Sequence, residues 1–293
     1  MKPAFDLNFA PCYGETVTLS NLVRRVTCEN PGAFTFKGTN SFIIGRGRVA
    51  IVDPGPDDAM HLAALLRGIQ GEKVSHIIVT HSHMDHSSLV AKLKLATGAV
   101  TYAGKLDSPS DRSIQLDASI DRRFQPDVIL TDGDVLDGEG WSLQAISTPG
   151  HLSNHICLNL PEEQALLSGD HVMAWATTVV APPEGHMGDY LASLHKLLQR
   201  RDEIYYPAHG PERQNPARLV RQILEHREMR EAAIYDRVKA GKSDLQEIVA
   251  DIYTDLDFRL HGAAALSTLA HLQHLMDQHL IEQLPNGTFK VAS

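Results

Sequence analysis

Cysteine is scarce in this sequence. The 293 residues include three cysteines, Cys12, Cys28 and Cys157, and no two of them are spaced as a CxxC pair. This number and spacing argue against a disulfide framework and against a cysteine-rich zinc site. We therefore expect packing roles for the cysteines and a reduced, cytoplasmic setting.

Long apolar stretches are also missing. The sequence has no run of about 20 apolar residues, which is the length that a membrane-spanning helix needs. The start of the chain, MKPAFDLNFAPCYGE, has neither the basic residues nor the apolar run of a secretory signal. We expect no membrane partner.

The chain has no excess of positive charge. Its 27 Lys and Arg against 36 Asp and Glu give a formal net charge of −9. Residues 1–210 carry 17 Lys and Arg against 24 Asp and Glu, a net charge of −7. Residues 211–293 carry 10 Lys and Arg against 12 Asp and Glu, a net charge of −2. Non-specific nucleic-acid binding is typical of basic surfaces. We therefore expect no duplex DNA partner and favour a small-molecule or carrier-linked substrate.

Short apolar runs and helical patterns alternate in the first part of the chain. The length and a hydrophobic fraction of 43% suffice for one large domain and a small one. Mixed strands and helices favour a layered α/β architecture. Strands are expected at Ser41–Ile44, Arg48–Asp53, Val74–Val79, Ala99–Ala103, Val128–Leu130, Ser142–Ser147, Ile156–Leu160, Ala165–Ser168 and Ile204–Tyr206, and helices at Asp58–Gly68, Ser87–Thr97 and Tyr190–Gln199.

The composition changes after Gly210, so we predict a first domain at residues 1–210 and a second at residues 211–293. Three helices and an Asn-Gly hairpin in the second part form a winged-helix pattern. They are expected at Asn215–Ala240, Ser243–Ile252, Gly262–Gln278 and, for the hairpin, Leu280–Gln283 with Thr288–Val291. The third helix has no Lys or Arg, which phosphate contacts need. Its apolar residues predict packing on the first domain or on a second copy in a homodimer.

A dense group of histidines follows the apolar strand Val74–Val79. His81 and His83 are two residues apart, so in extended backbone both rings lie on one side. Asp85 and His86 come where the chain turns into a helix and can point back to the same cavity. Imidazole nitrogens and a carboxylate in this arrangement are typical of zinc ligands.

Three further polar residues end strands at tight turns: His151, Asp170 and His209. Asp53, at another strand end, is expected to accept a hydrogen bond from a ligand imidazole. A chain with 16 histidines clusters some of them by chance, but this combination of run and strand-end turns favours a metal centre. We predict two divalent ions, zinc first with manganese or iron as alternatives, on His81, His83, Asp85, His86, His151, Asp170 and His209.

Four other residues are weaker candidates. His155 and His171 adjoin expected ligands and either line the site or pack beside it. His186 lies in a Pro-Gly loop between site elements, where it would either be a substrate-side group or have no role in the site. Tyr190 would either donate a hydrogen bond to the substrate or pack.

These motifs resemble the metallo-β-lactamase superfamily over roughly residues 20–210. The resemblance implies an α+β fold, an αββα sandwich with the metals at one edge of its sheets, followed here by the small winged-helix domain. It also implies how the ligands are shared: His81, His83 and His151 hold the first ion, Asp85, His86 and His209 hold the second, and Asp170 bridges them.

Two differences from other members of the superfamily argue against particular activities. True β-lactamases of the superfamily typically have a cysteine where Asp170 stands, so antibiotic hydrolysis is not expected. Flavodiiron oxidoreductases carry a glutamate in place of the second histidine of the run, and His83 instead favours hydrolysis.

A closer resemblance is to the β-lactamase-like protein 2 group, and it extends into the tail. It rests on Thr35–Asn40, Gly169–Met173, Thr177–Val180, His226-Arg227-Glu228, Leu256-Asp257 and Ala263–Leu272. The activities of that group are a metal-dependent single-strand endoribonuclease and thioesterases that act on carrier-bound polyketides.

We therefore expect a dinuclear metal-dependent hydrolase that uses a metal-bridging hydroxide, with Asp85 and Asp170 as its catalytic carboxylates and a thioester or ester as substrate. Cleavage of single-stranded RNA by the same site is one alternative. A glyoxalase II-like thioesterase is another, although the winged-helix tail departs from the helical, basic C-terminal region of that enzyme. A non-enzymatic, metal-sensing winged-helix regulator is the third.

Overall fold

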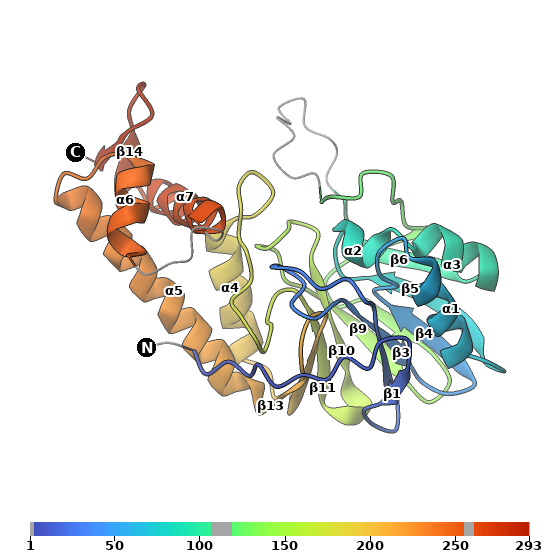
Figure 1. The fold of residues 1–293 in the computed structure, drawn as a ribbon. Coiled ribbons are helices and arrows are strands. Elements are labelled where there is room, and N and C mark those ends of the chain that lie inside the picture. Colours follow the sequence, from blue (N-terminus) through green and yellow to red (C-terminus); the bar gives the residue numbers. More distant parts are fainter. Residues whose placement is uncertain (1–2, 107–118, 255–260, 293) are drawn as a thin grey trace.

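The computed structural model describes residues 3–106, 119–254 and 261–292. Two β-sheets pack face to face at its centre (Figure 1). The first sheet follows the chain order, with antiparallel pairs up to β4 and parallel pairs from β4 to β7. Its strands are β1 (Thr16–Thr18), β2 (Val23–Thr27), β3 (Asn40–Ile44), β4 (Arg48–Val52), β5 (Lys73–Val79), β6 (Val100–Gly104) and β7 (Val128–Leu130).

The second sheet has the order β13-β12-β11-β10-β9-β8. Its strands are β8 (Val135–Asp137), β9 (Ser142–Ser147), β10 (Ile156–Leu160), β11 (Ala165–Gly169), β12 (Ile204–Pro207) and β13 (Arg213–Gln214). Fully buried side chains such as Ile78 from the first sheet and Leu158 from the second share one core between the sheets. Alternating apolar residues on the facing sides of both sheets build this core.

Helices cover the outer faces of both sheets. On the first sheet lie α1 (Ala59–Gly68) and α3 (Val90–Thr97), which bury Leu65 and Leu93 against Ile51 and Ile77. The single-turn helix α2 (Met84–Ser87) precedes α3. On the second sheet lie α4 (Met187–Leu198) and α5 (Pro216–Lys239), and a short 3₁₀ turn, Pro161–Glu163, joins β10 to β11. The expected αββα sandwich is confirmed.

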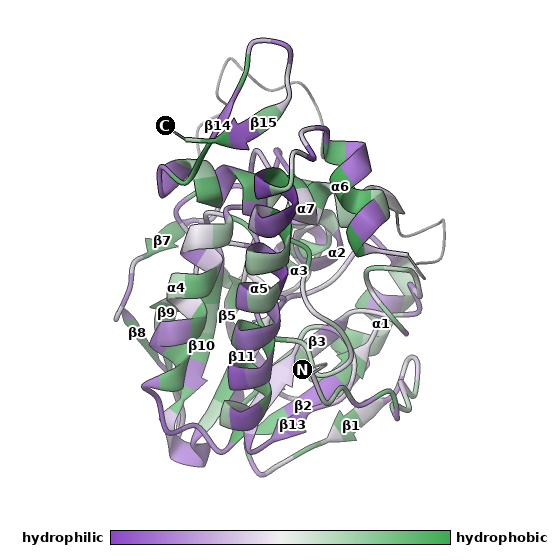
Figure 2. Cartoon of the chain, turned by 90° about the vertical axis from the view of Figure 1, so that its left-hand side faces the viewer, coloured by the Kyte–Doolittle hydropathy of each residue, from purple (hydrophilic) through white to green (hydrophobic). Residues whose placement is uncertain are grey.

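The tail completes a winged helix. Helix α6 (Leu245–Ile252), helix α7 (His261–Asp277) and the hairpin of β14 (Ile281–Gln283) and β15 (Phe289–Val291) follow α5. Their core includes Ile234 and Val238 from the end of α5. Because α5 also packs beside α4 on the second sheet (Figure 2), one helix belongs to both cores. The division after Gly210 stays a prediction, and the motif Leu256-Asp257 lies outside the described residues.

Several boundaries differ from the sequence expectations. Strands β1, β2, β8 and β13 were not expected. Two arginines in β2 hide its strand pattern, yet Arg25 is buried because it donates to the Ala10 carbonyl and stacks on the ring of Phe9. Helix α4 begins at Met187 rather than at Tyr190, since the side chain of His186 caps it by accepting from the Asp189 amide.

Within the described ranges, no helix combines the length and the apolar character that crossing a membrane requires.

Candidate metal centre

Strand ends bring the expected ligands to one edge of the sandwich. His81 and His83 follow β5, and α2 then carries Asp85 and His86. His151 stands on the turn after β9. Asp170 directly follows β11, and His209 comes two residues after the end of β12, the parallel neighbour of β11. The ligand atoms of three overlapping groups lie within 4.8 Å of one another: His81, His83 and His151; His81, His86 and Asp170; and Asp85, His86 and His209. All seven expected side chains are thus brought together.

The first group consists of three imidazoles whose ring nitrogens converge. His83 Nδ1 lies 2.9 Å from His81 Nε2 and 3.1 Å from His151 Nε2. The Nδ1 of His151 is 2.6 Å from the Val179 carbonyl, which can only accept, so that nitrogen carries the proton. The lone pair of His151 Nε2 therefore faces the other two rings, as a metal ligand requires.

Asp170 lies between this first group and the group of Asp85, His86 and His209, which is called the second group from here on. Its Oδ2 is 4.0 Å from His81 Nε2 and 3.7 Å from His86 Nε2, and its Oδ1 is 3.4 Å from His209 Nε2. Asp85 Oδ2 approaches His86 Nε2 at 3.4 Å and His209 Nε2 at 3.3 Å. One carboxylate thus reaches both groups, which is the arrangement needed to bridge two ions.

Neighbouring acceptors hold the rings of the second group. Asp53, whose backbone has a φ of 49°, accepts from the Thr80 amide at 2.7 Å and from Thr80 Oγ1 at 2.8 Å, and its Oδ2 lies 3.1 Å from His86 Nδ1. His209 Nδ1 donates to the Gly38 carbonyl at 3.2 Å. Both rings therefore present Nε2 to the centre, and Asp53 occupies the supporting position expected for it.

Imidazoles of the first and second groups differ in their pKa values. Burial, together with His83, lowers the pKa of His151 to about 4, and burial with His86 and His83 holds the pKa of His81 well below its ordinary value. Burial opposes charge on His209, but Asp170 and Asp85 raise its pKa to about 10. A divalent ion at the second group must therefore displace protons.

The residues fit a pair of transition-metal ions. Among the described residues, His86 Nε2 and Asp170 Oδ1 are buried and make no hydrogen bond, and their near neighbours are other side chains of the cluster. Leaving a buried polar atom without a hydrogen bond costs roughly 1–3 kcal/mol, and a bound ion would satisfy both atoms. Five imidazoles and two carboxylates are also the donor types that zinc, iron and manganese accept.

The weaker candidates have other roles. Tyr190 is completely buried and donates to the His171 carbonyl at 3.1 Å, so the proposed contact with substrate is wrong and Tyr190 packs. His186 caps α4, and its Nε2 lies 3.0 Å from Asp277 of α7, so both of its ring nitrogens already have protein partners. His155 is buried behind the site, where its Nε2 accepts from the Asp170 amide at 3.2 Å.

Sequence patterns could not reveal two of the supporting groups. The Val179 and Gly38 carbonyls orient His151 and His209 through the backbone, and a backbone acceptor leaves no trace in the residue type.

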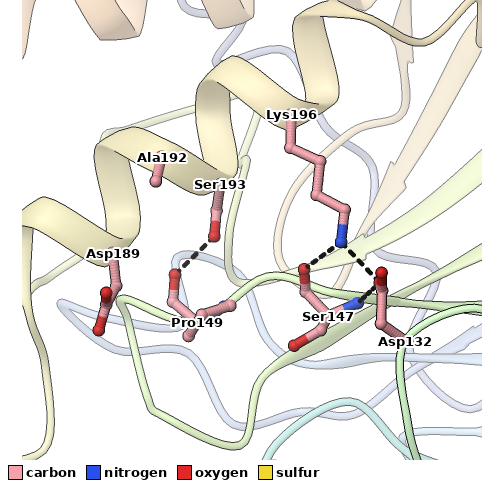
Figure 3. Close-up of a pocket in the computed structure, with 7 residues that line it drawn as sticks. All are labelled: Asp132, Ser147, Pro149, Asp189, Ala192, Ser193 and Lys196. Atoms are coloured by element: carbon pink, nitrogen blue, oxygen red, sulfur yellow. Dashed lines mark hydrogen bonds and ion pairs between the residues drawn. The ribbon is translucent and has the colours of Figure 1, made fainter.

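A surface hollow of about 290 Å³ lies beside the turn that carries His151 (Figure 3). Its polar lining is already paired: Lys196 Nζ donates to Asp132 at 2.6 Å and to the Ser147 carbonyl at 3.0 Å, and Ser193 donates to the Pro149 carbonyl at 2.8 Å. None of the seven clustered residues lines it. The hollow marks the contact between α4 and the second sheet, and the chemistry belongs to the metal centre.

Comparison with known families and proteins agrees with this geometry. Residues 34–209 match the metallo-beta-lactamase superfamily, and residues 245–288 match the beta-lactamase associated winged helix domain. The Beta-lactamase-like protein 2 homolog of Caenorhabditis elegans is 29% identical over 93% of this chain and 90% of its own length. The atrochrysone carboxyl ACP thioesterase of Aspergillus fumigatus is 32% identical over 76% of this chain and 67% of its own.

Solved structures share the architecture. A metallo-beta-lactamase family protein from Thermus thermophilus superposes with a TM-score of 0.76 at 20% identity, covering 94% of this chain and all of its own. A protein solved in a di-iron-bound form is 28% identical, with a TM-score of 0.53 over 69% of this chain and 96% of its own. The first of these likenesses extends through the tail and concerns the fold alone.

Proposed function

Because this chain belongs to the metallo-beta-lactamase superfamily of metal-dependent hydrolases, we propose that it works with two ions and cleaves a thioester or ester. The observation that carries the proposal is the position of Asp170, whose carboxylate lies within 4.0 Å of imidazole nitrogens from both ligand groups. A carboxylate in this position can hold two ions at a fixed separation.

The seven clustered residues would hold the two ions. One ion would be held by His81, His83 and His151, the other by Asp85, His86 and His209, with Asp170 between them. Bound divalent ions lower the pKa of water toward ~7 and stabilise negative charge on a substrate oxygen. We propose zinc, and the di-iron-bound relative makes iron the main alternative.

Two carboxylates have distinct tasks in this proposal. Asp170 is almost enclosed, with 10% of its side chain exposed, and it orients the groups around it. Asp85 is more accessible, with 26% of its side chain exposed, and can accept a hydrogen bond from an attacking water. Burial raises the pKa of each, but His86 and His209 outweigh it and hold both pKa values well below the ordinary range, so both groups are anions at neutral pH.

The substrate class is supported by the relatives and by charge. A relative at 32% identity bears the name of a thioesterase that acts on a carrier-protein-bound acid. The net charge of −9 disfavours a polyanionic substrate. Hydrolysis of a thioester or ester needs nucleophilic attack at one carbonyl carbon, after which the thiol or alcohol leaves. Two ions held by the seven converging ligands would support that attack.

The decisive experiment is reconstitution followed by a substrate screen. Metal-free protein would be loaded with zinc, iron or manganese and assayed on an N-acetylcysteamine thioester, an aryl ester, a lactone and single-stranded RNA. We expect close to two equivalents of metal and hydrolysis of the thioester or ester that a chelator abolishes. A single tightly bound equivalent would contradict the dinuclear centre, and cleavage of RNA without thioester or ester hydrolysis would replace the proposed substrate.

A further inference from the structure

The segment between β11 and α4 is irregular, yet it touches the metal centre twice. Residues 170–186 form no helix or strand. The segment begins with Asp170 and later supplies both groups next to His151 Nδ1, the Val179 carbonyl at 2.6 Å and Thr178 Oγ1 at 3.3 Å. Such a backbone has no strand ladder or helix to fix it, so other hydrogen bonds must hold it in place.

One of those bonds comes from a buried arginine of α5. Arg227 has an exposed fraction of 5%, and its Nη2 donates to the Thr178 carbonyl at 2.6 Å. Its Nη1 donates to Ser267 Oγ of α7 at 3.0 Å, and its guanidinium lies 5.5 Å from the ring centre of Tyr190. Both of these acceptors are neutral oxygens. Burying a charge on neutral acceptors is costly, so this placement points to a function.

The contacts form a continuous path to a metal ligand. Arg227 fixes the carbonyl of Thr178, and the next carbonyl along the chain, that of Val179, accepts the Nδ1 proton of His151. His151 Nε2 then faces His83 Nδ1 at 3.1 Å. If the Thr178 carbonyl moved, the acceptor that selects the His151 tautomer would move with it.

We propose that Arg227 is a positioning residue for the first metal ion: it holds Thr178 and Val179 so that His151 keeps its proton on Nδ1 and offers Nε2 to the ion. The tail takes part because Ser267 of α7 fixes the second arm of the guanidinium. The inference rests on the proposed two-metal function, and it gives the tail a role in supporting the metal centre. The two arms of the guanidinium donate to acceptors on two elements, whereas a lysine carries all its donors on one nitrogen, so we expect Arg227→Lys to lose at least one of the two bonds.

The test compares Arg227→Lys and Arg227→Met with Arg230→Lys, a matched control three residues along the same helix. Arg230 stacks on the ring of Tyr253 in the tail, with its guanidinium 4.3 Å from the ring centre. The tautomer of His151 would be determined in the metal-free protein by long-range ¹H–¹⁵N correlation. The affinity for Zn²⁺ would be measured by competition with a chromophoric chelator, and circular dichroism would report folding.

We expect both Arg227 variants to populate the Nε2-protonated tautomer of His151 and to bind one of the two Zn²⁺ ions about tenfold more weakly, the lower end of the effect of losing a supporting group. Ser267→Ala should change both readouts in the same direction by less, and Arg230→Lys should change neither.

The inference would be overturned if folded Arg227→Lys kept the wild-type tautomer and the wild-type Zn²⁺ affinity, even if its turnover fell. Should the Arg227 variants fail to fold, Ser267→Ala decides by the same two readouts. Failure of the proposed function is a separate result: a wild-type protein that binds two ions and responds as expected, but hydrolyses no thioester or ester, would retain the positioning role and lose the substrate.

Discussion

Among single residues, Asp170 has the widest reach across the metal centre. Its two oxygens approach imidazole nitrogens of His81, His86, His151 and His209 at 4.0, 3.7, 3.8 and 3.4 Å. The other carboxylate among the seven clustered residues, Asp85, forms its ion pairs within the described part of the chain with His86 and His209, both of the second group. A substitution at position 170 should therefore affect both ions, and one at position 85 chiefly the second.

For Asp170 we predict that Asp170→Ala and Asp170→Asn leave the fold intact, weaken binding of the second ion most and of the first ion as well, and remove most hydrolysis. Losing a ligand that also orients the reacting groups should cost several kcal/mol of transition-state stabilisation, a fall in kcat of at least about 100-fold. Elemental analysis and steady-state kinetics measure the two effects. Asp170→Asn keeps the shape of the side chain, so two tightly bound ions and wild-type turnover in that variant would show that Asp170 does not bridge.

A second residue, His61, acts behind the centre and gives a pH dependence of stability. Its Nε2 lies 2.8 Å from Ser41 Oγ, which donates to the Asp53 carbonyl. Burial lowers the pKa of His61 to about 4, against about 6.5 in the unfolded chain. Because the unfolded state then binds the extra proton, stability should be complete above pH ~6.5 and fall as the pH drops toward ~4, by at most roughly 3 kcal/mol.

We predict that His61→Gln, whose amide can still bond Ser41, reduces this loss of stability on acidification. Urea unfolding at several pH values, with a chelator present so that metal release does not contribute, measures the slope. Identical slopes for the two proteins between pH 6.5 and 4 would show that His61 is not held neutral in the folded state.

At the level of elements, the turn that carries His151 is pressed against α4. A Cβ on Gly150, which has a φ of +134°, would lie 2.3 Å from the Tyr190 Cα and 2.4 Å from its amide nitrogen. Both are helix backbone atoms, which cannot swing aside as a flexible side chain could. The spacing between α4 and the turn therefore leaves room for glycine alone.

Gly150→Ala should consequently push the turn away from α4 and displace His151. We predict a loss of stability larger than the roughly 1–2 kcal/mol of left-handed strain alone, together with weaker zinc binding. Gly133→Ala is the control, because Gly133 has a φ of +91° with nothing within 4 Å of the added Cβ. Equal effects of the two substitutions on urea unfolding and zinc binding would show that contact with α4 is unimportant.

Some elements and site residues could be predicted from the sequence, and others could not. The strand before His81 and the strand-end turns at Asp170 and His209 were readable, because side-chain type and spacing report strand ends directly. Strand β2 was missed, since the burial of Arg25 depends on Phe9 and the Ala10 carbonyl from a distant segment. The contacts of Arg227 were likewise invisible, because they join α5, α7 and an irregular loop that only the folded chain brings together.

For the molecule as a whole, the tail's third helix is used for packing. Thr268, His271, Leu272 and Leu275 of α7 are buried, and the helix contacts α4, α5 and α6. It also has no Lys or Arg. We predict that the intact protein does not retard duplex DNA at physiological salt and that any weak binding lacks a steep salt dependence. Tight, sequence-specific binding in a gel-shift assay would instead revive the regulator hypothesis.

Helix α5 joins the two parts of the molecule more firmly than a linker would. Its first half buries Leu219, Val220 and Ile223 in the core on the outer face of the second sheet, beside Leu194 of α4. Its second half contributes Ile234 to the tail core. Cutting the chain after Gly210 therefore uncovers a sheet face rather than releasing an independent module, whereas a cut after residue 240 leaves that face covered.

We accordingly predict that residues 1–210 expressed alone aggregate or lose activity, because removing α5 exposes a contiguous apolar surface that soluble monomers avoid. Residues 1–240 should be more soluble, since the helix that covers the second sheet remains. They should still bind Zn²⁺ more weakly than the whole chain, because Ser267 no longer fixes Arg227. Light scattering, size exclusion and chelator competition compare the three proteins. A 1–210 fragment that stays soluble, monomeric and fully active would show that the tail neither covers the sheet nor supports the centre, and equal Zn²⁺ affinity of 1–240 and the whole chain would restrict its role to covering the sheet.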